Sequence, residues 1–444
     1  MLKRSYYNIP IKQKGFTIIY NSFSDHFLGV SQEVANRLGS GIFDPENFRI
    51  AFPKTFAKLQ DLGMLIDDGI DELDLIKKRY EAAKFRDKRL YLMLYPTQDC
   101  NLKCWYCYES HKQGTKMSEA VIESVLNYVN KVLSDDKYEA IHVGFFGGEP
   151  LMNFSSIAYP LAKGIKKICE SKAKAFSTFF VTNASLMTES IIEKMKELNP
   201  YFQITIDGYR EKHDNVRVWK NSGKGTYEQI IKAIHVLSQR LPNHDVSDDP
   251  LITLRINYDN STLKNLDSLI EDIEDLDKTK VRIHLERVWQ TRALVDVEQR
   301  TLLINAFKKL FNKGFTITHG VFKRKSISCP SDSNSFLIIN YDGTIHKCNG
   351  RTLDEDTQEG IINQAGEIRW TNEREEKRLK LVTFNNSNCL RCKMLPVCMG
   401  PCSQKYLEEG GFSDSICCMH SIDIPINTYL GYEFEMRYLL ENQE

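Results

Sequence analysis

The residues best able to do chemistry lie in TQDCNLKCWYCYE, residues 97–109, which places three cysteines in one short stretch. Cys100, Cys104 and Cys107 follow a Cx3Cx2C pattern, so on a tight loop their thiolates can converge on one metal centre. A tetrahedral zinc site takes four ligands, and so does an ordinary iron–sulfur cluster. Either a fourth ligand completes the site, as His111 would in a zinc knuckle, or the fourth position is left open.

A second group of cysteines lies near the C-terminus, where the sequence has few long periodic segments. It includes CLRCKMLPVCMGPC, with the spacing Cx2Cx5Cx3C. A segment so rich in loops buries little apolar surface, so we expect bound metal to supply part of its folding free energy. A zinc ribbon from Cys389 to Cys402 is the alternative to iron–sulfur clusters. The group comprises Cys329, Cys348, Cys389, Cys392, Cys398, Cys402, Cys417 and Cys418.

The elements that must position the first cysteines alternate between strands and helices from about residue 90 to residue 289. Such alternation predicts βαβ crossovers and parallel strands, hence an α/β fold with a partial (β/α)6 barrel of the TIM type. Active-site residues of such barrels gather at the C-terminal strand ends, and the cysteine triplet follows the first strand at that end. The predicted strands are RLYLMLY, AIHVGFF, FSTFFVT, FQITIDG, LITLRINY and VRIHLERV.

The N-terminal region predicts a small module of its own. FTIIYN and HFLGVS are expected to be strands, followed by the helix QEVANRL with Ser31 as its cap. The helix PKTFAKLQDLG and the strand MLIDD complete a winged-helix-like order, and ELDLIKKRYEAAKFR is expected to be the connecting helix. The alternative is a purely structural cap. We therefore predict domains at residues 1–85, 86–320 and 321–444.

Composition limits the class of protein. The chain has 444 residues, and its 59 Lys and Arg balance its 59 Asp and Glu, so a basic nucleic-acid-binding surface is not expected. Neither a signal peptide nor an apolar run long enough to span a bilayer is present in the sequence, which predicts a cytoplasmic protein without a membrane partner. In that compartment twelve cysteines favour metal binding or redox chemistry over disulfides.

The motifs resemble those of the radical S-adenosylmethionine (SAM) superfamily. CNLKCWYCY matches its Cx3C-x-aromatic-C motif, with Tyr106 as the aromatic residue, and FFGGEPLMN matches its GGEP motif. Paired glycines would let a ligand approach the backbone, and Glu149 could pair with the ammonium group of SAM. The resemblance implies a SAM site formed by Tyr106, Gly147, Gly148, Glu149, Pro150, Thr182, Asn183, Thr205, Asp207 and Arg255, with Asn257 beside Arg255.

The C-terminal cysteines resemble a SPASM extension, which implies two auxiliary [4Fe–4S] clusters and three clusters in total. The implied ligands of the second auxiliary cluster are Cys389, Cys392, Cys398 and one of Cys417 and Cys418. Those of the first are Cys329, Cys348 and Cys402. Some relatives have a further cysteine between the first two of these. Here there is none, so the first auxiliary cluster is expected to have an open iron or a non-cysteine ligand. Because adjacent Cα atoms lie only about 3.8 Å apart, Cys417 and Cys418 are not expected to serve two clusters.

The resemblance also implies a reaction. SAM would bind at the open position of the first cluster, and its one-electron reduction would yield methionine and a 5′-deoxyadenosyl radical that abstracts hydrogen. Relatives with this extension mostly modify peptides, and the N-terminal module resembles their leader-recognition domains. We therefore expect a maturase of a ribosomally made precursor peptide with a leader sequence, which forms a thioether or carbon–carbon crosslink. An electron donor such as flavodoxin or ferredoxin is the second expected partner. The alternatives are an anaerobic sulfatase-maturating enzyme, which forms formylglycine, and a non-catalytic iron–sulfur redox scaffold. No catalytic side chain is assigned.

Overall fold

The computed structural model describes residues 1–243, 250–288, 290, 296–319 and 325–441, and the chain divides into two compact units. One unit comprises residues 1–84, 321–329 and 381–444, and the other comprises residues 85–320 and 330–380. The first 84 residues thus share a unit with the cysteine-rich C-terminal segment. The domain boundaries expected from the sequence remain predictions.

The larger unit is built on a sheet that has eleven strands among the described residues, in the order β14-β13-β12-β10-β9-β8-β6-β15-β16-β17-β18. Every neighbouring pair from β14 to β15 is parallel, and the last three strands continue the sheet antiparallel. The parallel strands are β6 (Arg89–Leu94), β8 (Ala140–Phe145), β9 (Ala175–Thr182), β10 (Pro200–Ile206), β12 (Ile252–Tyr258), β13 (Val281–Arg287), β14 (Thr316–His319) and β15 (Phe336–Ile339). The antiparallel strands are β16 (Thr344–His346), β17 (Gly360–Ile362) and β18 (Ile368–Trp370).

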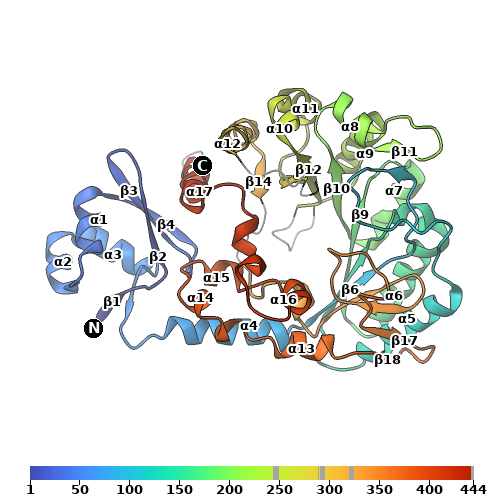
Figure 1. Cartoon of the computed structure of the whole chain (residues 1–444), viewed down its shortest axis with the longest axis horizontal. Helices are drawn as coiled ribbons and strands as arrows, with labels where there is room; N and C mark the ends of the chain where they lie inside the picture. Colours follow the sequence, from blue (N-terminus) through green and yellow to red (C-terminus); the bar gives the residue numbers. More distant parts are fainter. Residues whose placement is uncertain (244–249, 289, 291–295, 320–324, 442–444) are drawn as a thin grey trace. The chain divides into compact units, whose positions relative to one another are not determined.

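Helices connect the parallel strands and lie along the outer side of the sheet in Figure 1. Side chains alternate along the strands: on β12, Ile252 and Leu254 are fully buried, whereas the alternating Thr253 and Arg255 belong to the opposite, partly accessible face. The sheet therefore presents polar side chains on the side away from the helices. These helices are α5 (Glu119–Val132), α6 (Tyr159–Ser171), α7 (Glu189–Met195), α8 (Arg210–Val216), α9 (Tyr227–Arg240), α10 (Asn260–Lys264), α11 (Leu266–Ile273) and α12 (Val297–Asn312), whereas α13 (Arg374–Lys380) follows the antiparallel strand β18.

This architecture confirms the predicted α/β class. All six predicted strands form at the expected residues, as β6, β8, β9, β10, β12 and β13. The parallel sheet extends beyond them on both sides, because β14 pairs with β13 and β15 pairs with β6. These two strands are only four residues long, too short for sequence periodicity to reveal them.

The N-terminal part of the smaller unit contains the predicted strands and helices. β3 (Phe16–Asn21) and β4 (His26–Ser31) form a hairpin, and β2 (Asn8–Lys12) completes a three-stranded antiparallel sheet. Ser31 caps the N-terminus of α1 (Gln32–Gly39), because its side chain accepts a hydrogen bond from the Val34 amide. The other elements are α2 (Pro45–Ala51), α3 (Pro53–Asp61), α4 (Glu72–Phe85) and a pair of strands, β1 (Leu2–Arg4) with β5 (Leu65–Asp67). The comparison with a winged helix remains a prediction.

The small sheet buries both of its faces within its unit. Ile19 packs against the helices α1–α3 through Val34 and Phe56. On the opposite face, Ile18 and Tyr20 belong to a cluster with Met394, Val397 and Leu430 of the C-terminal segment. That segment contains α14 (Ser387–Leu390), α15 (Leu395–Cys398), α16 (Ser403–Glu409) and α17 (Ile426–Glu441). The N-terminal module therefore shares a hydrophobic core with the segment that carries the C-terminal cysteines.

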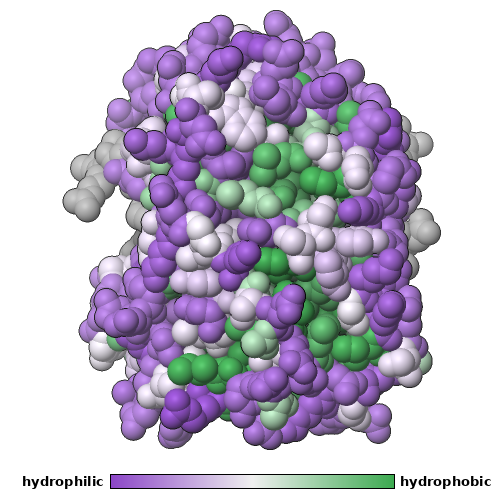
Figure 2. Space-filling model, turned by 90° about the vertical axis from the view of Figure 1, so that its right-hand side faces the viewer, coloured by the Kyte–Doolittle hydropathy of each residue, from purple (hydrophilic) through white to green (hydrophobic). Residues whose placement is uncertain are grey.

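The surface view in Figure 2 shows a face covered mostly by hydrophilic side chains, with hydrophobic residues gathered in small groups toward its middle. Within the described residues, we find no helix with both the length and the apolar composition needed to cross a membrane.

Candidate active site

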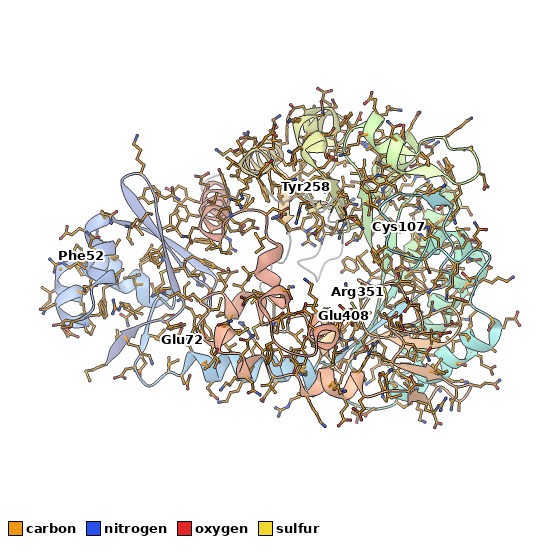
Figure 3. The ribbon with its side chains drawn as sticks, viewed as in Figure 1. Phe52, Glu72, Cys107, Tyr258, Arg351 and Glu408 are labelled. Carbon is orange, nitrogen blue, oxygen red and sulfur yellow. The ribbon has the colours of Figure 1, made fainter. Side chains whose placement is uncertain are left out.

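The three motif cysteines line one cavity of about 190 Å³ at the C-terminal ends of the parallel strands. Figure 3 shows Cys107 on the side of the strands rather than among the outer helices. Of the residues predicted for SAM, the cavity is lined by Tyr106, Gly147, Gly148, Glu149, Thr182, Asn183, Thr205 and Arg255. Pro150 and Asp207 are not among its lining residues. The tertiary structure thus brings together most of a set that the sequence spreads over 150 residues.

The two glycines of the GGEP motif allow two loops to pack together. A Cβ atom on Gly148 would lie 2.0 Å from the carbonyl oxygen of Asp99, and one on Gly147 would lie 2.3 Å from that of Thr97. The close approach is fixed by backbone hydrogen bonds from the Gly148 amide to Thr97 and from the Glu149 amide to Asp99. We had expected these glycines to make room for a ligand. In this structure, the contact that requires them is with the loop that carries Cys100, Cys104 and Cys107 (the cysteine loop).

Glu149 connects the ends of neighbouring strands. Its carboxylate accepts hydrogen bonds from the Thr182 hydroxyl (2.7 Å), the Asn183 amide (2.8 Å) and the Leu151 amide (3.0 Å). Burial raises the pKa of this carboxyl to about 7, although these hydrogen bonds act in the opposite direction. All of these contacts are with the protein itself, so the pairing of Glu149 with a ligand ammonium remains a prediction.

The Tyr106 hydroxyl is held by three side chains from different strands or loops. It donates a hydrogen bond to Asp207 (2.6 Å) and accepts one from Arg217 (2.6 Å) and one from Asn257 (2.8 Å). Arg217 also forms a buried ion pair with Asp207. Burial alone would lower the pKa of the Arg217 guanidinium, but Tyr106 and Asp207 beside it outweigh that effect, so it stays charged. Arg217 was not among the SAM-site residues that the resemblance implied, although it lies ten residues after Asp207.

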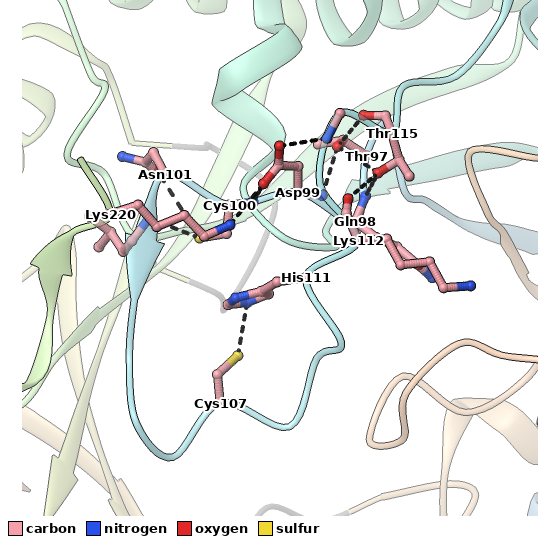
Figure 4. A network of polar contacts seen from close by, with 12 residues as sticks. Thr97, Gln98, Asp99, Cys100, Asn101, Cys107, His111, Lys112, Thr115 and Lys220 are labelled. Carbon is pink, nitrogen blue, oxygen red and sulfur yellow. Dashed lines mark hydrogen bonds and ion pairs between the residues drawn. The ribbon is translucent and has the colours of Figure 1, made fainter.

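The cysteine loop is closed at its base by Asp99, as Figure 4 shows. The Asp99 carboxylate accepts hydrogen bonds from the Cys100 amide (2.8 Å), the Gly114 amide (2.9 Å) and the Lys220 ammonium (2.9 Å). Burial would raise the pKa of Asp99, but these hydrogen bonds hold it below its usual value. The three contacts fix where the loop leaves the strand and where it returns.

The thiols suit a cluster that takes three protein ligands. Burial raises the pKa of the Cys100 thiol to about 12 and that of Cys107 to about 11, so metal binding must displace their protons. Among the described residues, the thiols that line the cavity are those of Cys100, Cys104 and Cys107. A [4Fe–4S] cluster bound there would supply one electron to SAM. The chain's own residues hold the loop and shape the cavity.

His111, the alternative fourth ligand for zinc, lies with its Nε2 3.2 Å from Cys107 Sγ. In the part of the chain that is described, no three Cys, His, Asp or Glu side chains converge on the position of a single metal ion.

The C-terminal cysteines fall into both units. Cys348 belongs to the larger unit, whereas Cys329 and Cys402 belong to the smaller one, so their joint cluster remains a prediction. Burial raises the pKa of the Cys389 thiol to about 11, and the nearby thiols of Cys417, Cys392 and Cys418 raise it further. Burial also raises the pKa of the Cys398 thiol, and the nearby thiols of Cys392, Cys418 and Cys389 raise it further. The residues expected at the second auxiliary cluster therefore lie near one another.

Glu109 is a feature of the cavity that sequence analysis missed. It lies two residues after the last motif cysteine and is only 8% exposed. Burial raises its pKa to about 8. Both of its carboxyl oxygens lack a hydrogen-bond partner among the described residues. No sequence signal other than its position next to the motif could have identified it.

Comparison with known proteins identifies the family. The family model of the radical SAM superfamily matches residues 94–286. The uncharacterized protein MJ0907 of Methanocaldococcus jannaschii is 30% identical over 298 residues, which are 64% of this chain and 92% of that protein. The radical SAM cyclopropyl synthase TigE of Paramaledivibacter caminithermalis is 21% identical over 77% of this chain and 74% of its own. A cysteine-type anaerobic sulfatase-maturating enzyme of Clostridium novyi is 21% identical over 74% of this chain and 93% of its own.

Solved structures share the fold. Native anSMEcpe with bound AdoMet and a Cp18Cys peptide aligns with a TM-score of 0.58 at 19% identity, over 80% of this chain and all of that one. Streptococcus suis SuiB bound to its precursor peptide SuiA aligns with a TM-score of 0.51 at 17% identity, over 94% of this chain and all of that one. The match to the family model and to the curated relatives, together with the cysteine loop and the GGEP motif, establishes that the chain is an enzyme of the radical SAM superfamily.

Proposed function

We propose that this enzyme is a maturase of a ribosomally made peptide, which abstracts a hydrogen atom from the precursor and joins two of its residues by a thioether or carbon–carbon bond. The observation that carries the proposal is a groove in the N-terminal module, separate from the SAM cavity. A SAM cavity alone fits any member of the superfamily. A groove suited to an extended chain favours a peptide substrate.

The groove has a volume of about 420 Å³ and runs between the edge strand β4 and the helix α3. β4 pairs with β3 on one side and has no strand partner on the other among the described residues. The backbone groups of such an edge can hydrogen-bond an added strand. The buried side chains of Val30 and Val34 line the groove, and the exposed Lys54 and Lys58 flank it. An extended leader with alternating apolar side chains and some acidic ones would match these features.

The comparisons support both this proposal and its alternative. SuiB, whose structure includes a precursor peptide, aligns over 94% of this chain, whereas anSMEcpe aligns over 80%. The alternative, formylglycine formation on a sulfatase, draws support from the C. novyi relative, which covers nearly as much of the chain as TigE does. The groove in residues 28–58 favours the leader-guided maturase. A non-catalytic scaffold would have no need of the SAM cavity.

The proposal includes three [4Fe–4S] clusters and an external electron donor. The auxiliary clusters would be held by the C-terminal cysteines, in line with the mutual influence of Cys389, Cys392 and Cys418. The donor would approach the cysteine loop at Trp105, whose ring is 62% exposed. β7 (Leu102–Lys103) pairs with β11 (Val218–Trp219), and the exposed charged residues of segments 101–117 and 218–225 are lysines: Lys103, Lys112, Lys116 and Lys224. This surface suits an acidic carrier such as a flavodoxin or ferredoxin.

The decisive experiment measures peptide binding after a charge reversal at the groove. Synthetic peptides from short open reading frames beside the gene would be labelled, and their affinities for the full chain measured by fluorescence anisotropy. Lys54→Glu with Lys58→Glu should weaken binding about ten-fold or more, because two attractive contacts become repulsive. Deleting the whole module is less informative, because Ile18 and Tyr20 share a core with the C-terminal segment.

The matched control is Lys12→Glu with Lys14→Glu, which reverses two exposed lysines at β2, the other edge strand of the same sheet, and just after it. Equal losses in both variants would refute leader binding at β4. Mass spectrometry of the product separates the two functions. Two residues that remain joined after proteolysis identify a crosslink, and a single aldehyde-bearing residue identifies formylglycine.

A further inference from the structure

The charged groups around the SAM cavity leave one carboxyl without a role. Glu109 and Glu149 are the acidic residues among its described lining residues. Glu149 already accepts three hydrogen bonds from the protein. Asp207, just outside the lining, is paired with Arg217 and Tyr106. Glu109 therefore differs from every carboxylate that the sequence motifs identified.

Among the described residues, no donor lies within hydrogen-bond distance of either carboxyl oxygen of Glu109. The hydroxyl of the adjacent Tyr108 is already bonded to the Asn349 carbonyl (2.7 Å). The hydroxyl of Tyr95, a fully buried residue electrostatically coupled to Glu109, likewise has no hydrogen-bond partner among the described residues. Buried carboxyl oxygens are almost always satisfied in folded proteins, so an unsatisfied one at a cavity wall calls for a donor from a ligand.

We propose that Glu109 is a SAM-binding residue, whose carboxyl accepts a hydrogen bond from one of the donor groups of SAM. Those donors are its ammonium group, its two ribose hydroxyls and the amino group of its adenine. The assignment rests on the SAM cavity of the superfamily and not on the proposed peptide substrate. It gives Glu109 the contact with a ligand donor that sequence analysis assigned to Glu149, whose oxygens are already occupied.

Replacing Glu109 by Leu tests the proposal, because Leu has a similar size and no hydrogen-bonding atoms. The dissociation constants of SAM and of S-adenosylhomocysteine would be measured by anaerobic calorimetry on protein with reconstituted clusters and without peptide. A hydrogen bond to a charged group is worth about a ten- to hundred-fold change in affinity. Both compounds carry the same donors, so both should bind about that much more weakly.

The melting temperature of the ligand-free protein is a second readout. A purely structural role of Glu109 would lower it in the Glu109→Leu variant. Removing an unsatisfied buried carboxyl should leave the melting temperature of the ligand-free protein unchanged or higher. Iron content should equal that of the wild type, because Cys107 is untouched. Glu109→Gln, which keeps one acceptor, should give an intermediate loss of affinity. The matched control is Ser110→Ala, which changes the next, exposed residue of the same loop.

Three results would overturn the proposal. Unchanged affinity for both compounds would mean that Glu109 serves an ordered water or nothing. A loss confined to SAM would mean that the carboxylate acts on the sulfonium charge rather than on a hydrogen-bond donor. A lower melting temperature with lost iron would mean that Glu109 supports the cysteine loop. Because no peptide is present, none of these results depends on the proposed maturase activity.

Discussion

Replacing Asp207 by Asn tests how the site is held together. Asp207 is 1% exposed, and its carboxylate pairs with the buried Arg217 and accepts the Tyr106 hydroxyl proton in a hydrogen bond. Asn has nearly the same shape but no charge, so the variant leaves the Arg217 guanidinium buried without a counter-charge. Tyr106 then keeps only Arg217 and Asn257 as partners of its hydroxyl among the described residues.

The size of the effect follows from burial. Breaking a buried ion pair by removing one partner costs about 3–5 kcal/mol, whereas an exposed pair contributes about 0–1 kcal/mol. For a folding unit of this size, each kcal/mol shifts the melting temperature by about 2–4 °C. Asp207→Asn should therefore lower the melting temperature of the larger unit by about 6 °C or more.

The assay is calorimetric unfolding of the protein without SAM, with iron content measured in parallel. Glu367→Gln is the matched control, because Glu367 forms an exposed ion pair with Lys131 in the same unit, with side chains 56% and 61% exposed. That variant should melt within about 4 °C of the wild type. Equal shifts in the two variants would refute the argument that the buried Asp207–Arg217 ion pair stabilises the site. A loss of SAM affinity without any loss of stability would instead show that Asp207 contacts SAM directly.

Two further predictions concern the cysteine loop and the clusters. Gly148→Ala should displace the loop and reduce the iron of the SAM cluster, because the new Cβ would lie 2.0 Å from the Asp99 carbonyl oxygen; Gly39→Ala, which meets no atom within 4 Å, is the control, and equal iron in both would contradict the packing argument. Changing Cys100, Cys104 and Cys107 together to Ala should lower iron from about twelve to about eight per chain and abolish SAM cleavage. About eight irons or fewer in fully reconstituted wild type would contradict the three-cluster proposal.

The sequence by itself determined the features that local patterns encode. Strand–helix alternation is a local property of side-chain periodicity, so it located all six predicted strands. Helix caps are local too, which is why Ser31 was recognised at the start of α1. The Cx3Cx2C spacing and the GGEP motif led to the correct superfamily, because the loop that carries the ligands is continuous in sequence.

Only the tertiary structure decided what the polar residues of the site do. Arg217 reaches Tyr106 across 111 residues of sequence, and Thr182 reaches Glu149 across 33, so no local pattern could pair them. The carboxyl of Glu109, which has no hydrogen-bond partner among the described residues, has no sequence signature, because its partners depend on which side chains the fold brings near it. Spacing tells which side chains share a loop, whereas burial and hydrogen bonding depend on segments that meet only when the parallel strands assemble.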